Sequence, residues 1–302
     1  MISVIMLTYN RETLVKKAIE SILAQTFEDF EFIIVDNGSN DKSGKIADDY
    51  AKKDKRIKVT HKERGNIGSG RNAGLDVAKG DYIAFIDDDD WCEPDFLEFM
   101  YNLIIEYDAD IAMCGANDKI FDERVLYTAE EALITLFWRR RFNVQFPTKL
   151  IKCELFNGIR FSVTAKYDDI DLMPKIMAST NKIAYHGIPK YTFYRHTSNN
   201  SLWTKYHNLL NFETLNEYLN VYRMRTVWLC ERFPEKTELW NYFEWSFILS
   251  MVEKVSRYEI TECRSLYDNM ISTLRVNIDT FLDNEFLQDF EKVWIRKFIT
   301  NS

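Results

Sequence analysis

Four consecutive aspartates, Asp87 to Asp90, are the residues of this sequence with the clearest chemical potential. Adjacent carboxylates repel one another, so each resists ionisation unless a cation offsets the charge. Carboxylate oxygens suit Mg²⁺ or Mn²⁺, and alternate residues of an extended segment point to the same side. Asp87 and Asp89 are therefore predicted to act together on a divalent metal ion. The alternative is a solvated acidic turn ahead of a helix that begins near Pro94.

Polar residues follow two other apolar runs: Thr8, Tyr9 and Asn10 after residues 2–7, and Asp36 and Asn37 after residues 31–35. Parallel strands present their carboxyl ends at one edge of a sheet, where α/β proteins bind their ligands. A carboxylate after the second strand often holds a ribose or a base, which is the role predicted for Asp36. The alternative is an Asx-turn that leads into the loop at Ser39.

A glycine-rich segment, residues 65–74, carries Arg71 and leads into a helix. Backbone N–H groups at such a turn, together with a guanidinium charge, can bind phosphate. The run from Gly68 to Ala73 also matches the G-x-G-x-x-A fingerprint of dinucleotide-binding proteins, although it follows the third strand rather than the first. An NAD-dependent oxidoreductase is therefore an alternative function, and close packing of the helix on the sheet is the structural alternative.

Alternating strands and helices are expected to position these residues. Apolar runs predict strands at 2–7, 31–35, 56–60, 82–86 and 110–114. An amphipathic pattern predicts a helix over 11–25, capped by Asn10, and a second helix follows Pro94. Continuous apolar strands that alternate with helices predict a mainly parallel sheet covered on both faces.

The overall composition restricts the function classes that fit this chain. Its 302 residues are 46% hydrophobic, which excludes a disordered chain, and the net charge of −8 argues against nucleic acid as a partner. Five cysteines without a C-x-x-C pair are typical of reduced thiols in a cytoplasmic protein. The strand-like start, and no apolar stretch of roughly 18 residues, lead us to expect neither a secretory leader nor a membrane span.

Taken together, the motifs resemble those of a known enzyme family. The segments that carry the resemblance are Thr8-Tyr9-Asn10, Ser21-Ile-Leu-Ala-Gln25-Thr26-Phe27, Val35-Asp36-Asn37-Gly38-Ser39, Arg71-Asn72-Ala73-Gly74, Lys79-Gly80-Asp81-Tyr82 and Asp87-Asp88-Asp89-Asp90. In this order they resemble the inverting family 2 glycosyltransferases of GT-A fold, of the bacterial cell-surface polysaccharide type. The resemblance is dense over residues 1–115 and continues more thinly to about residue 201.

The resemblance implies an α/β fold of GT-A type, in which a Rossmann-like, mostly parallel sheet binds the nucleotide and a helical region follows. We expect a nucleotide-sugar-binding half over 1–115, an acceptor-side half over 116–202 and a helical C-terminal region over 203–302. In that last region, apolar periodicity predicts helices at 208–232, 236–257 and 262–276.

The resemblance also implies which residues hold the nucleotide sugar. The residues expected to contact the donor are Thr8, Tyr9, Asn10, Asp36, Asn37, Arg71, Asp87, Asp88 and Arg195. Tyr9 and its neighbours would contact the nucleobase, and Arg195 would lie on a loop over the diphosphate. Asn37 departs from the Asp-Asp pair usual in the family, but its amide oxygen can still accept a hydrogen bond from the N3–H group of uracil.

The resemblance also implies a metal site and a general base. Asp89 would ligate the Mn²⁺ or Mg²⁺ ion that bridges the diphosphate, with Asp87 near the ribose or a metal-bound water. Asp169, in the acidic pair Asp168–Asp169, would be the general base, and capping of a helix is its structural alternative. For His196, both a metal-ligating and a packing role are open.

The function implied is metal-dependent, inverting transfer of a sugar from a nucleotide sugar, with a UDP-hexose as the expected donor. The expected acceptor is a saccharide or a polyprenyl-linked saccharide of polysaccharide biosynthesis. We expect a cytoplasmic protein that contacts the inner face of the cell membrane and self-associates through its C-terminal helices. A nucleotide-sugar-binding module without transfer activity is the non-enzymatic alternative.

Overall fold

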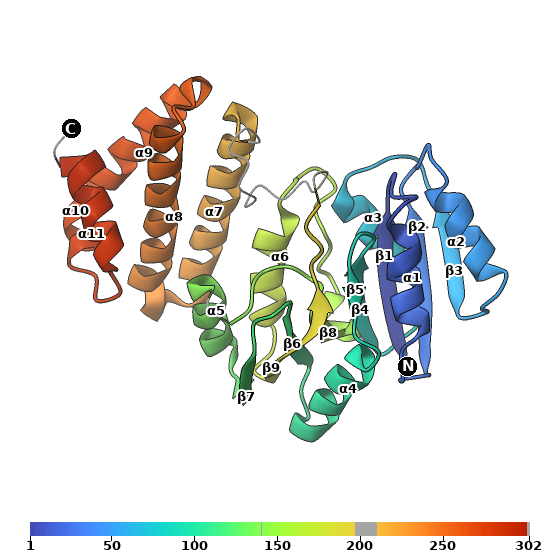
Figure 1. The fold of residues 1–302 in the computed structure, drawn as a ribbon. Coiled ribbons are helices and arrows are strands. Elements are labelled where there is room, and N and C mark those ends of the chain that lie inside the picture. The colour runs from blue at the N-terminus through green and yellow to red at the C-terminus, as the bar shows by residue number, and fades with distance from the viewer. Residues whose placement is uncertain (140, 197–209, 301–302) are drawn as a thin grey trace. The chain divides into compact units, whose positions relative to one another are not determined.

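The computed structural model describes residues 1–139, 141–196 and 210–300, with the backbone alone at residue 168. The chain divides into two compact units, Met1–His196 and Thr197–Ser302. The first is an α/β unit with a largely parallel sheet, and the second is helical (Figure 1), so the predicted fold class is confirmed. The expected boundary at 202/203 lies outside the described residues.

The nucleotide-binding half predicted from the sequence contains four neighbouring parallel strands. In sheet order they are β3 (Ile57–His61), β2 (Phe30–Asp36), β1 (Ile2–Thr8) and β4 (Tyr82–Asp87). The helices along this part of the chain are α1 (Val15–Leu23), α2 (Ser43–Ala51), α3 (Ile67–Val77) and α4 (Phe96–Tyr107). Because β1 pairs Thr8 with Asp36 on one side and Leu7 with Asp87 on the other, the polar residues that follow these strands meet at one edge.

The second half of the sheet is mixed. Its strands are β5 (Trp91–Cys92), β6 (Ile111–Ala116), β7 (Phe121–Tyr127), β8 (Lys149–Lys152) and β9 (Ile183–Thr192). β8 runs antiparallel between β4 and β6, β9 runs parallel to β6, and β5 and β7 are antiparallel to β9. The helices here are α5 (Ala129–Trp138), the 3₁₀ turn η1 (Cys153–Phe156) and α6 (Asp168–Met177).

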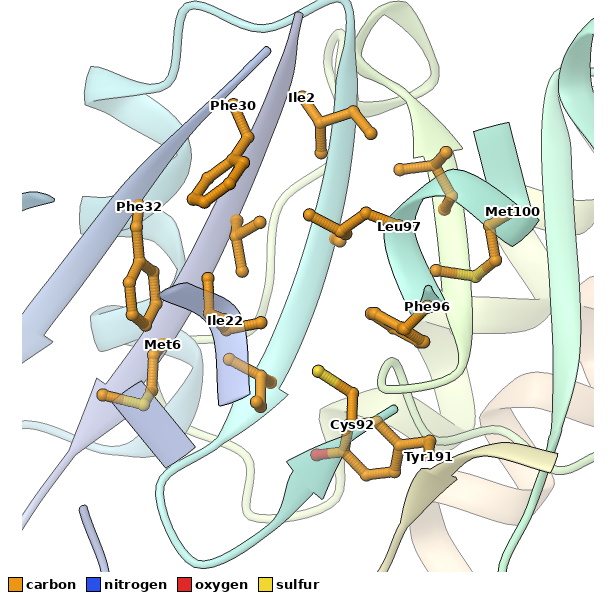
Figure 2. Close-up of a cluster of buried hydrophobic side chains, with 14 of the residues drawn as sticks. Ile2, Met6, Ile22, Phe30, Phe32, Cys92, Phe96, Leu97, Met100 and Tyr191 are labelled. Carbon is orange, nitrogen blue, oxygen red and sulfur yellow. The ribbon is translucent and has the colours of Figure 1, made fainter. Parts of the chain in front are cut away.

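The main core lies between one face of the sheet and helices α1, α2 and α4 (Figure 2). Alternate residues of β1, including Ile2 and Met6, point into it, where they are buried with Ile22, Phe96 and Leu97. Burial of such side chains contributes about 1.5–3 kcal/mol each. The opposite face of β1 packs against α3.

Helix α1 begins later than predicted. It starts at Val15, and Leu14 precedes it without a side-chain cap. Asn10 has a left-handed φ of 51°, and its Oδ1 accepts a hydrogen bond from the Asn40 N–H (2.9 Å). The prediction that Asn10 caps this helix is therefore wrong: its side chain joins two loops at the edge of the sheet.

The C-terminal unit is helical, as predicted. It contains α7 (Phe212–Arg232), α8 (Thr237–Arg257), α9 (Arg264–Val276), α10 (Ile278–Leu282) and α11 (Asp289–Ile295), with short turns at Pro234–Lys236, Thr261–Cys263 and Arg296–Thr300. Aromatic side chains fill its interior, where Trp240 and Tyr242 are almost completely buried and the Tyr222 and Phe247 rings stack 3.5 Å apart. Among the residues that the structure describes, no helix has both the length and the apolar character needed to cross a membrane.

Candidate active site

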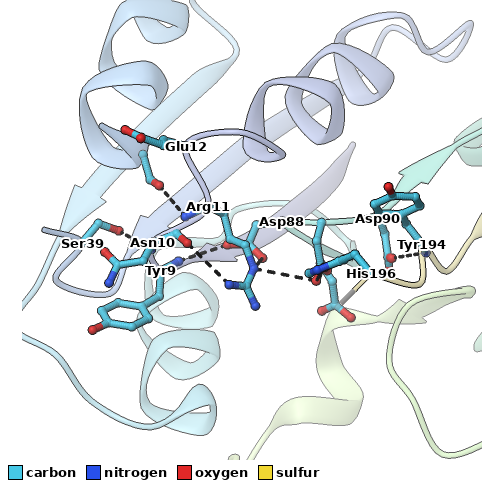
Figure 3. A network of polar contacts seen from close by, with 12 residues as sticks. Tyr9, Asn10, Arg11, Glu12, Ser39, Asp88, Asp90, Tyr194 and His196 are labelled. Atoms are coloured by element: carbon cyan, nitrogen blue, oxygen red, sulfur yellow. Dashed lines mark hydrogen bonds and ion pairs between the residues drawn. The ribbon is translucent and has the colours of Figure 1, made fainter. Parts of the chain in front are cut away.

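The acidic turn connects β4, which ends at Asp87, to β5. Its main chain is held by Tyr191 of β9, whose hydroxyl accepts a hydrogen bond from the Asp87 N–H (3.1 Å) and donates one to Asp90 Oδ2 (2.9 Å). The Tyr194 N–H donates to Asp90 Oδ1 (2.8 Å; Figure 3). Asp90 is buried, and burial together with the charge of Asp87 raises its pKa to about 8. The fourth aspartate thus anchors the turn to β9.

Arg11 and His196 lie against the second and third aspartates (Figure 3). Arg11 Nε is 3.8 Å from Asp88 Oδ1 and 3.8 Å from Asp89 Oδ2. His196 Nε2 is 2.8 Å from Asp89 Oδ2, and the Tyr9 N–H donates to Asp88 Oδ2 at 3.0 Å. Burial and the charge of Asp89 raise the pKa of Asp88 well above its usual range. An arginine and a histidine thus face two largely buried carboxylates.

Arg71 lies on α3, and aromatic rings surround its guanidinium. The centroids of Phe85, Phe146 and Phe161 are 5.8, 5.5 and 5.3 Å from its Cζ. Its Nη2 is 3.5 Å from Asp87 Oδ1. The rings exclude water from part of the guanidinium, which strengthens its interaction with nearby charges.

Asp169 lies half-buried in the first turn of α6. Burial raises its pKa, while Arg71 and the N–H groups of Ile170 and Asp169 itself oppose the shift. Burial also raises the pKa of Asp87; Arg71 counteracts this, and the charges of Asp89 and Asp169 add to it. The charge of Arg71 therefore acts on both carboxylates, which puts Asp169 within electrostatic range of the end of β4.

Lys149, at the start of β8, is a second cation near the predicted base. It is fully buried and donates hydrogen bonds to the carbonyl oxygens of Asn143 (2.9 Å) and Gln145 (2.5 Å). Burial lowers its pKa to about 7, although Cys114 and Asp169 act in the opposite direction. Its charge also contributes to holding Asp169 ionised.

Asp36, at the end of β2, is buried at the other side of the site. Its Oδ1 accepts a hydrogen bond from the Ser39 N–H (3.0 Å), three residues on. The side chain thus stabilises the loop at Ser39, although an Asx-turn would bond the residue two positions on. Its Oδ2 lies 3.0 Å from His61 Nδ1. Both oxygens thus have partners within the protein, and each retains a second lone pair for a ligand.

Asn37 is buried beside Asp36. Its Nδ2 donates to the Gly65 carbonyl (2.8 Å), and its Oδ1 accepts from the Gly65 N–H (3.1 Å) and from Lys62 Nζ (3.0 Å). The side chain therefore fixes the loop at residues 62–65. Its role as a reader of the pyrimidine stays a prediction.

Tyr9 is stacked with an arginine. Arg64 Cζ lies 3.8 Å from the centroid of the Tyr9 ring. Gly38, at φ +79°, allows the Arg64 main chain to approach closely, because a Cβ atom there would lie 2.8 Å from the Arg64 backbone nitrogen. Tyr9, Gly38 and Arg64 thus form one surface at the ends of β1 and β2, where the nucleobase is predicted to bind.

The remaining predicted donor residues lie around this edge. Thr8 is buried, and its carbonyl oxygen accepts a hydrogen bond from the Asn37 N–H (2.9 Å), while Asn10 is exposed. Arg195 is exposed in the segment after β9, next to His196. The side chain of Asp168 lies outside the described residues.

The divalent ion that the resemblance implies requires carboxylate or other oxygen ligands. Within the described part of the chain, no group of three or more His, Cys, Asp or Glu side chains is arranged to hold a metal. A Mg²⁺ ion in nucleotide enzymes commonly takes one or two carboxylates and completes its coordination with phosphate oxygens and water. Asp89 and Asp87 fit that pattern, and His196 Nε2 lies 2.8 Å from Asp89 Oδ2. Burial raises the pKa of Asp87, a shift that a bound cation would oppose.

Gly70 of the dinucleotide fingerprint and the nearby Gly74 have a packing role. Gly70 and Gly74 lie inside α3 against β1, where a Cβ atom would come within 2.1 Å of Leu7 Cδ1 and 2.4 Å of Ile5 Cγ2. Asn66 caps the helix by accepting a hydrogen bond from the Ser69 N–H (2.8 Å). The segment therefore matches the structural alternative of close helix–sheet packing, and the oxidoreductase interpretation loses its basis.

Several charged residues of the site were not predicted from the sequence. Arg11 and Arg64 follow predicted strand ends by a few residues, which was a usable signal. Nothing in the sequence indicated that Lys149 is buried in the site, because a lysine at the start of a short strand is ordinarily exposed. Its position is set by pairing with β6, where Lys149 lies opposite Met113.

Comparisons with known proteins agree on one enzyme class. The family model described as "Glycosyl transferase family 2" matches residues 3–168. Glycosyltransferase GlyG of Streptococcus pneumoniae serotype 4 is 33% identical over 224 residues, which span 68% of this chain and 74% of GlyG. Glycosyltransferase GlyA of the same organism is 31% identical over 224 residues, but the match spans only 32% of GlyA.

Solved structures show the same fold. The crystal structure of S. aureus TarS 1–349 in complex with UDP-GlcNAc superposes with a TM-score of 0.73 at 21% identity, covering 93% of this chain and 83% of that one. The mannosyltransferase PcManGT from Pyrobaculum calidifontis, in complex with GDP-Man and Mn²⁺, gives a TM-score of 0.56 at 13% identity, covering 98% of this chain and 83% of that one.

Proposed function

The chain belongs to glycosyl transferase family 2 and is a glycosyltransferase that uses a nucleotide sugar, and from this we propose that it is a metal-dependent, inverting hexosyltransferase with a UDP-sugar donor. The observation that carries the proposal is the position of Arg71, which interacts with Asp87 at the end of β4 and with Asp169 at the start of α6. A strand end predicted to bind the donor and a half-buried carboxylate thus lie within range of one guanidinium. The TarS structure with UDP-GlcNAc supports a uridine nucleotide.

In the proposed reaction, an acceptor hydroxyl attacks the anomeric carbon of the sugar in line with the departing diphosphate. Asp169 removes the proton of the hydroxyl as the new C–O bond forms and the bond to the diphosphate oxygen breaks. The raised pKa of Asp169, caused chiefly by burial, makes it a stronger base than an exposed carboxylate. Configuration at the anomeric carbon inverts because a single displacement occurs.

The leaving group carries the negative charge of a nucleoside diphosphate. Asp89, with Asp87 and the adjacent His196, would hold a divalent ion, which supplies positive charge to that leaving group. Arg71 supplies a fixed guanidinium in a partly dry environment, where electrostatic stabilisation is strongest. Arg11 lies against Asp88 and Asp89 and keeps these carboxylates from repelling an approaching diphosphate.

For the acceptor we propose a saccharide or a lipid-linked saccharide of polysaccharide biosynthesis at the cytoplasmic face of the membrane. Several apolar side chains of the C-terminal unit are exposed, including Val276 (82%), Val293 (60%) and Phe290 (52%). They support contact with a membrane surface or with a second copy of the chain. Sedimentation with lipid vesicles and light scattering of the V293S variant would separate the two interactions.

The proposed activity is tested with a panel of nucleotide sugars, each incubated with Mn²⁺ or with EDTA. We expect slow hydrolysis of one UDP-hexose that requires the metal, because water can replace the acceptor. Hydrolysis of a purine nucleotide sugar alone would contradict the proposed donor. Donor binding without any hydrolysis or transfer would favour the binding-module alternative.

A further inference from the structure

His61 links the buried Asp36 to the surface of the molecule. It is the last residue of β3 and lies directly opposite Asp36 in the β2–β3 register. Its Nδ1 is 3.0 Å from Asp36 Oδ2, and its Nε2 is 3.0 Å from Oδ1 of Asp48 on α2. The Asp36 side chain is 9% exposed, whereas those of His61 and Asp48 are 50% and 44% exposed.

The two carboxylates determine the protonation state that this geometry requires. A neutral imidazole carries one N–H group, so it can donate to only one of two carboxylates. Both ring nitrogens of His61 are within hydrogen-bond distance of carboxylate oxygens, which accept but do not donate. The arrangement is therefore that of an imidazolium. Hydrogen bonds to Asp36 and then Asp48 raise the pKa of His61.

The start of helix α2 packs closely against this pair. Gly44, in the first turn of α2, packs directly on it: a Cβ atom there would come within 2.4 Å of Asp36 Oδ2 and 3.2 Å of His61 Cε1. The Ser39 N–H fixes the other oxygen of Asp36 at 3.0 Å. The orientation of the Asp36 carboxylate thus depends on two partners, and His61 is the one that can lose its proton.

We propose that His61, as an imidazolium, is a positioning residue for Asp36 and makes the affinity for the donor nucleoside dependent on pH. This inference rests on the proposed function, in which Asp36 contacts the base or ribose of the donor. The charged groups that contact His61 are Asp36 from β2 and Asp48 from α2. The neighbouring Lys62 ammonium bonds instead to Asn37 Oδ1, the Glu63 carbonyl and Ser69 Oγ.

The direction of the effect follows from the hydrogen bonds. When His61 loses its proton, one ring nitrogen presents a lone pair to a carboxylate, so either Asp36 or Asp48 loses its bond. Loss of the imidazolium also removes a positive charge near an anionic donor. Both effects weaken donor binding as pH rises through the pKa of His61.

The first test is calorimetric titration with UDP-GlcNAc and Mg²⁺ between about pH 5.5 and pH 8.5, the range in which histidine titrates. UDP-GlcNAc is preferred to UDP, because the diphosphate of UDP-GlcNAc is esterified at both ends and does not titrate in this pH range. We expect Kd to rise about fivefold with pH, within the usual range of coupling between two sites. The H61Q variant should bind at the weaker level of the wild type at high pH and lose the part of the dependence that His61 causes, while the contribution of Asp90, whose pKa is about 8, remains.

The D48N variant separates positioning from a general loss of structure. Without Asp48, the midpoint of the pH dependence should shift to lower pH, while Asp36 and its contact with His61 remain. D49N is the matched control, because Asp49 is exposed on the same helix and pairs with Lys45 and Lys52. An unshifted midpoint in D48N, or the same pH dependence in H61Q, would overturn the proposal.

Linkage supplies an independent measurement. If the imidazolium favours donor binding fivefold, saturating UDP-GlcNAc must raise the pKa of His61 by about 0.7 pH unit. The chain has four histidines, so the His61 ring signal can be assigned by NMR with the H61Q variant. An unchanged His61 titration in the bound enzyme would overturn the proposal. Failure of UDP-GlcNAc to bind at any pH would instead overturn the proposed donor, and with it this inference.

Discussion

The imidazole Nε2 of His196 lies 2.8 Å from Oδ2 of Asp89, although the two residues are 107 positions apart in the chain. The Tyr194 ring stacks on the imidazole, with centroids 5.5 Å apart and an interplanar angle of 28°. The turn after β4 and the segment after β9 thus bring a carboxylate and an imidazole together. This pair is where the proposed metal site can be tested most directly.

We predict that Asp89→Asn abolishes the gain in UDP affinity that Mn²⁺ provides. The amide retains the shape of the carboxylate but lacks the charge that a divalent cation requires. UDP binding would be measured by calorimetry with Mn²⁺ and with EDTA, with the exposed Asp118→Asn as the control. His196→Gln, run in parallel, shows whether the imidazole is a ligand or a packing group. Equal UDP affinity with Mn²⁺ and with EDTA in the wild type would count against the site.

Asp169→Asn is predicted to slow transfer by about 10²–10⁴-fold, the typical contribution of a general base. Donor affinity should persist, because the amide keeps the shape and loses only the basicity. Transfer rate and UDP affinity would be measured on the same preparation. The matched control is Asp171→Asn, two residues along α6, where the carboxylate pairs with Lys175 at 2.6 Å. Transfer within a few-fold of the wild type would eliminate Asp169 as the base.

The pH dependence of transfer should report on the same carboxylate. Because burial raises the pKa of Asp169 and a base must be deprotonated to act, the rate should fall in acid starting at a higher pH than an exposed aspartate would cause. A rate profile at saturating donor measures this directly. Lys149→Met removes the buried cation and should move the acid limb to higher pH. A limb that stays in place would show that Lys149 does not influence the base.

Asn37→Asp should weaken UDP binding about fivefold, which corresponds to the loss of one ordinary hydrogen bond, without changing base preference. The carboxylate cannot donate to the Gly65 carbonyl, whereas the bond from Lys62 becomes stronger. Competition between UDP and GDP measures both quantities, with Asn40→Asp as an exposed control. A switch of preference from uridine to guanosine would instead show that Asn37 reads the base directly.

Glu31→Gln should lower the free energy of unfolding by about 2 kcal/mol at neutral pH, typical of hydrogen bonds to a buried charged group. Glu31 accepts bonds from Ser3 Oγ and the Lys79 N–H, each 2.6 Å long, and from Lys58. Burial raises its pKa, but the bonds from Lys58, Ser3 and Lys79 outweigh burial and hold the pKa below its usual range.

The sign of this effect can be checked by chemical denaturation at several pH values. A depressed folded-state pKa gives stability that is full above the unfolded-state value and is lost as pH falls through the folded-state value. The difference between wild type and Glu31→Gln should therefore shrink in acid. The exposed Glu28→Gln serves as the control. If the difference in unfolding free energy between wild type and Glu31→Gln does not change with pH, the charge of Glu31 is not the source of the stabilisation.

A chain truncated after residue 202 is predicted to retain UDP binding if it folds. Every described residue of the proposed donor site lies within Met1–His196, which is one compact unit. Circular dichroism would verify folding before calorimetry with UDP. A folded truncation without UDP affinity would place part of the donor site in the C-terminal unit.

The parallel half of the sheet could be predicted because its strands are continuous apolar runs. The strand predicted at 31–35 is Phe30–Asp36 in the structure, and the strand predicted at 82–86 is Tyr82–Asp87. The run at 110–114, in the mixed half, was also nearly correct. β8 was missed because it has four residues with a lysine at each end, one of them buried by tertiary contacts. α6 was obscured by Pro174, which lies inside the helix.

The site was predictable where residues follow strands, because the carboxyl ends of parallel strands must meet at one edge. That rule located Thr8, Asp36 and Asp87. It could not reveal that Asn37 is engaged by Gly65 or that Lys149 is buried, because those contacts depend on how distant loops pack. Contacts between polar or charged residues far apart in the chain leave no periodic pattern in the sequence, so they could not be predicted from it.

The Tyr191 hydroxyl that joins Asp87 to Asp90 also has a kinetic consequence. The Asp87 amide proton is bonded to a fully buried tyrosine, so it can exchange with solvent only when β9 separates from the acidic turn. The exchange rate of this single amide therefore measures how often the two segments part. Slower exchange with bound nucleotide would mean that the donor suppresses this local opening, and deuterium labelling would follow it without any chemical reaction.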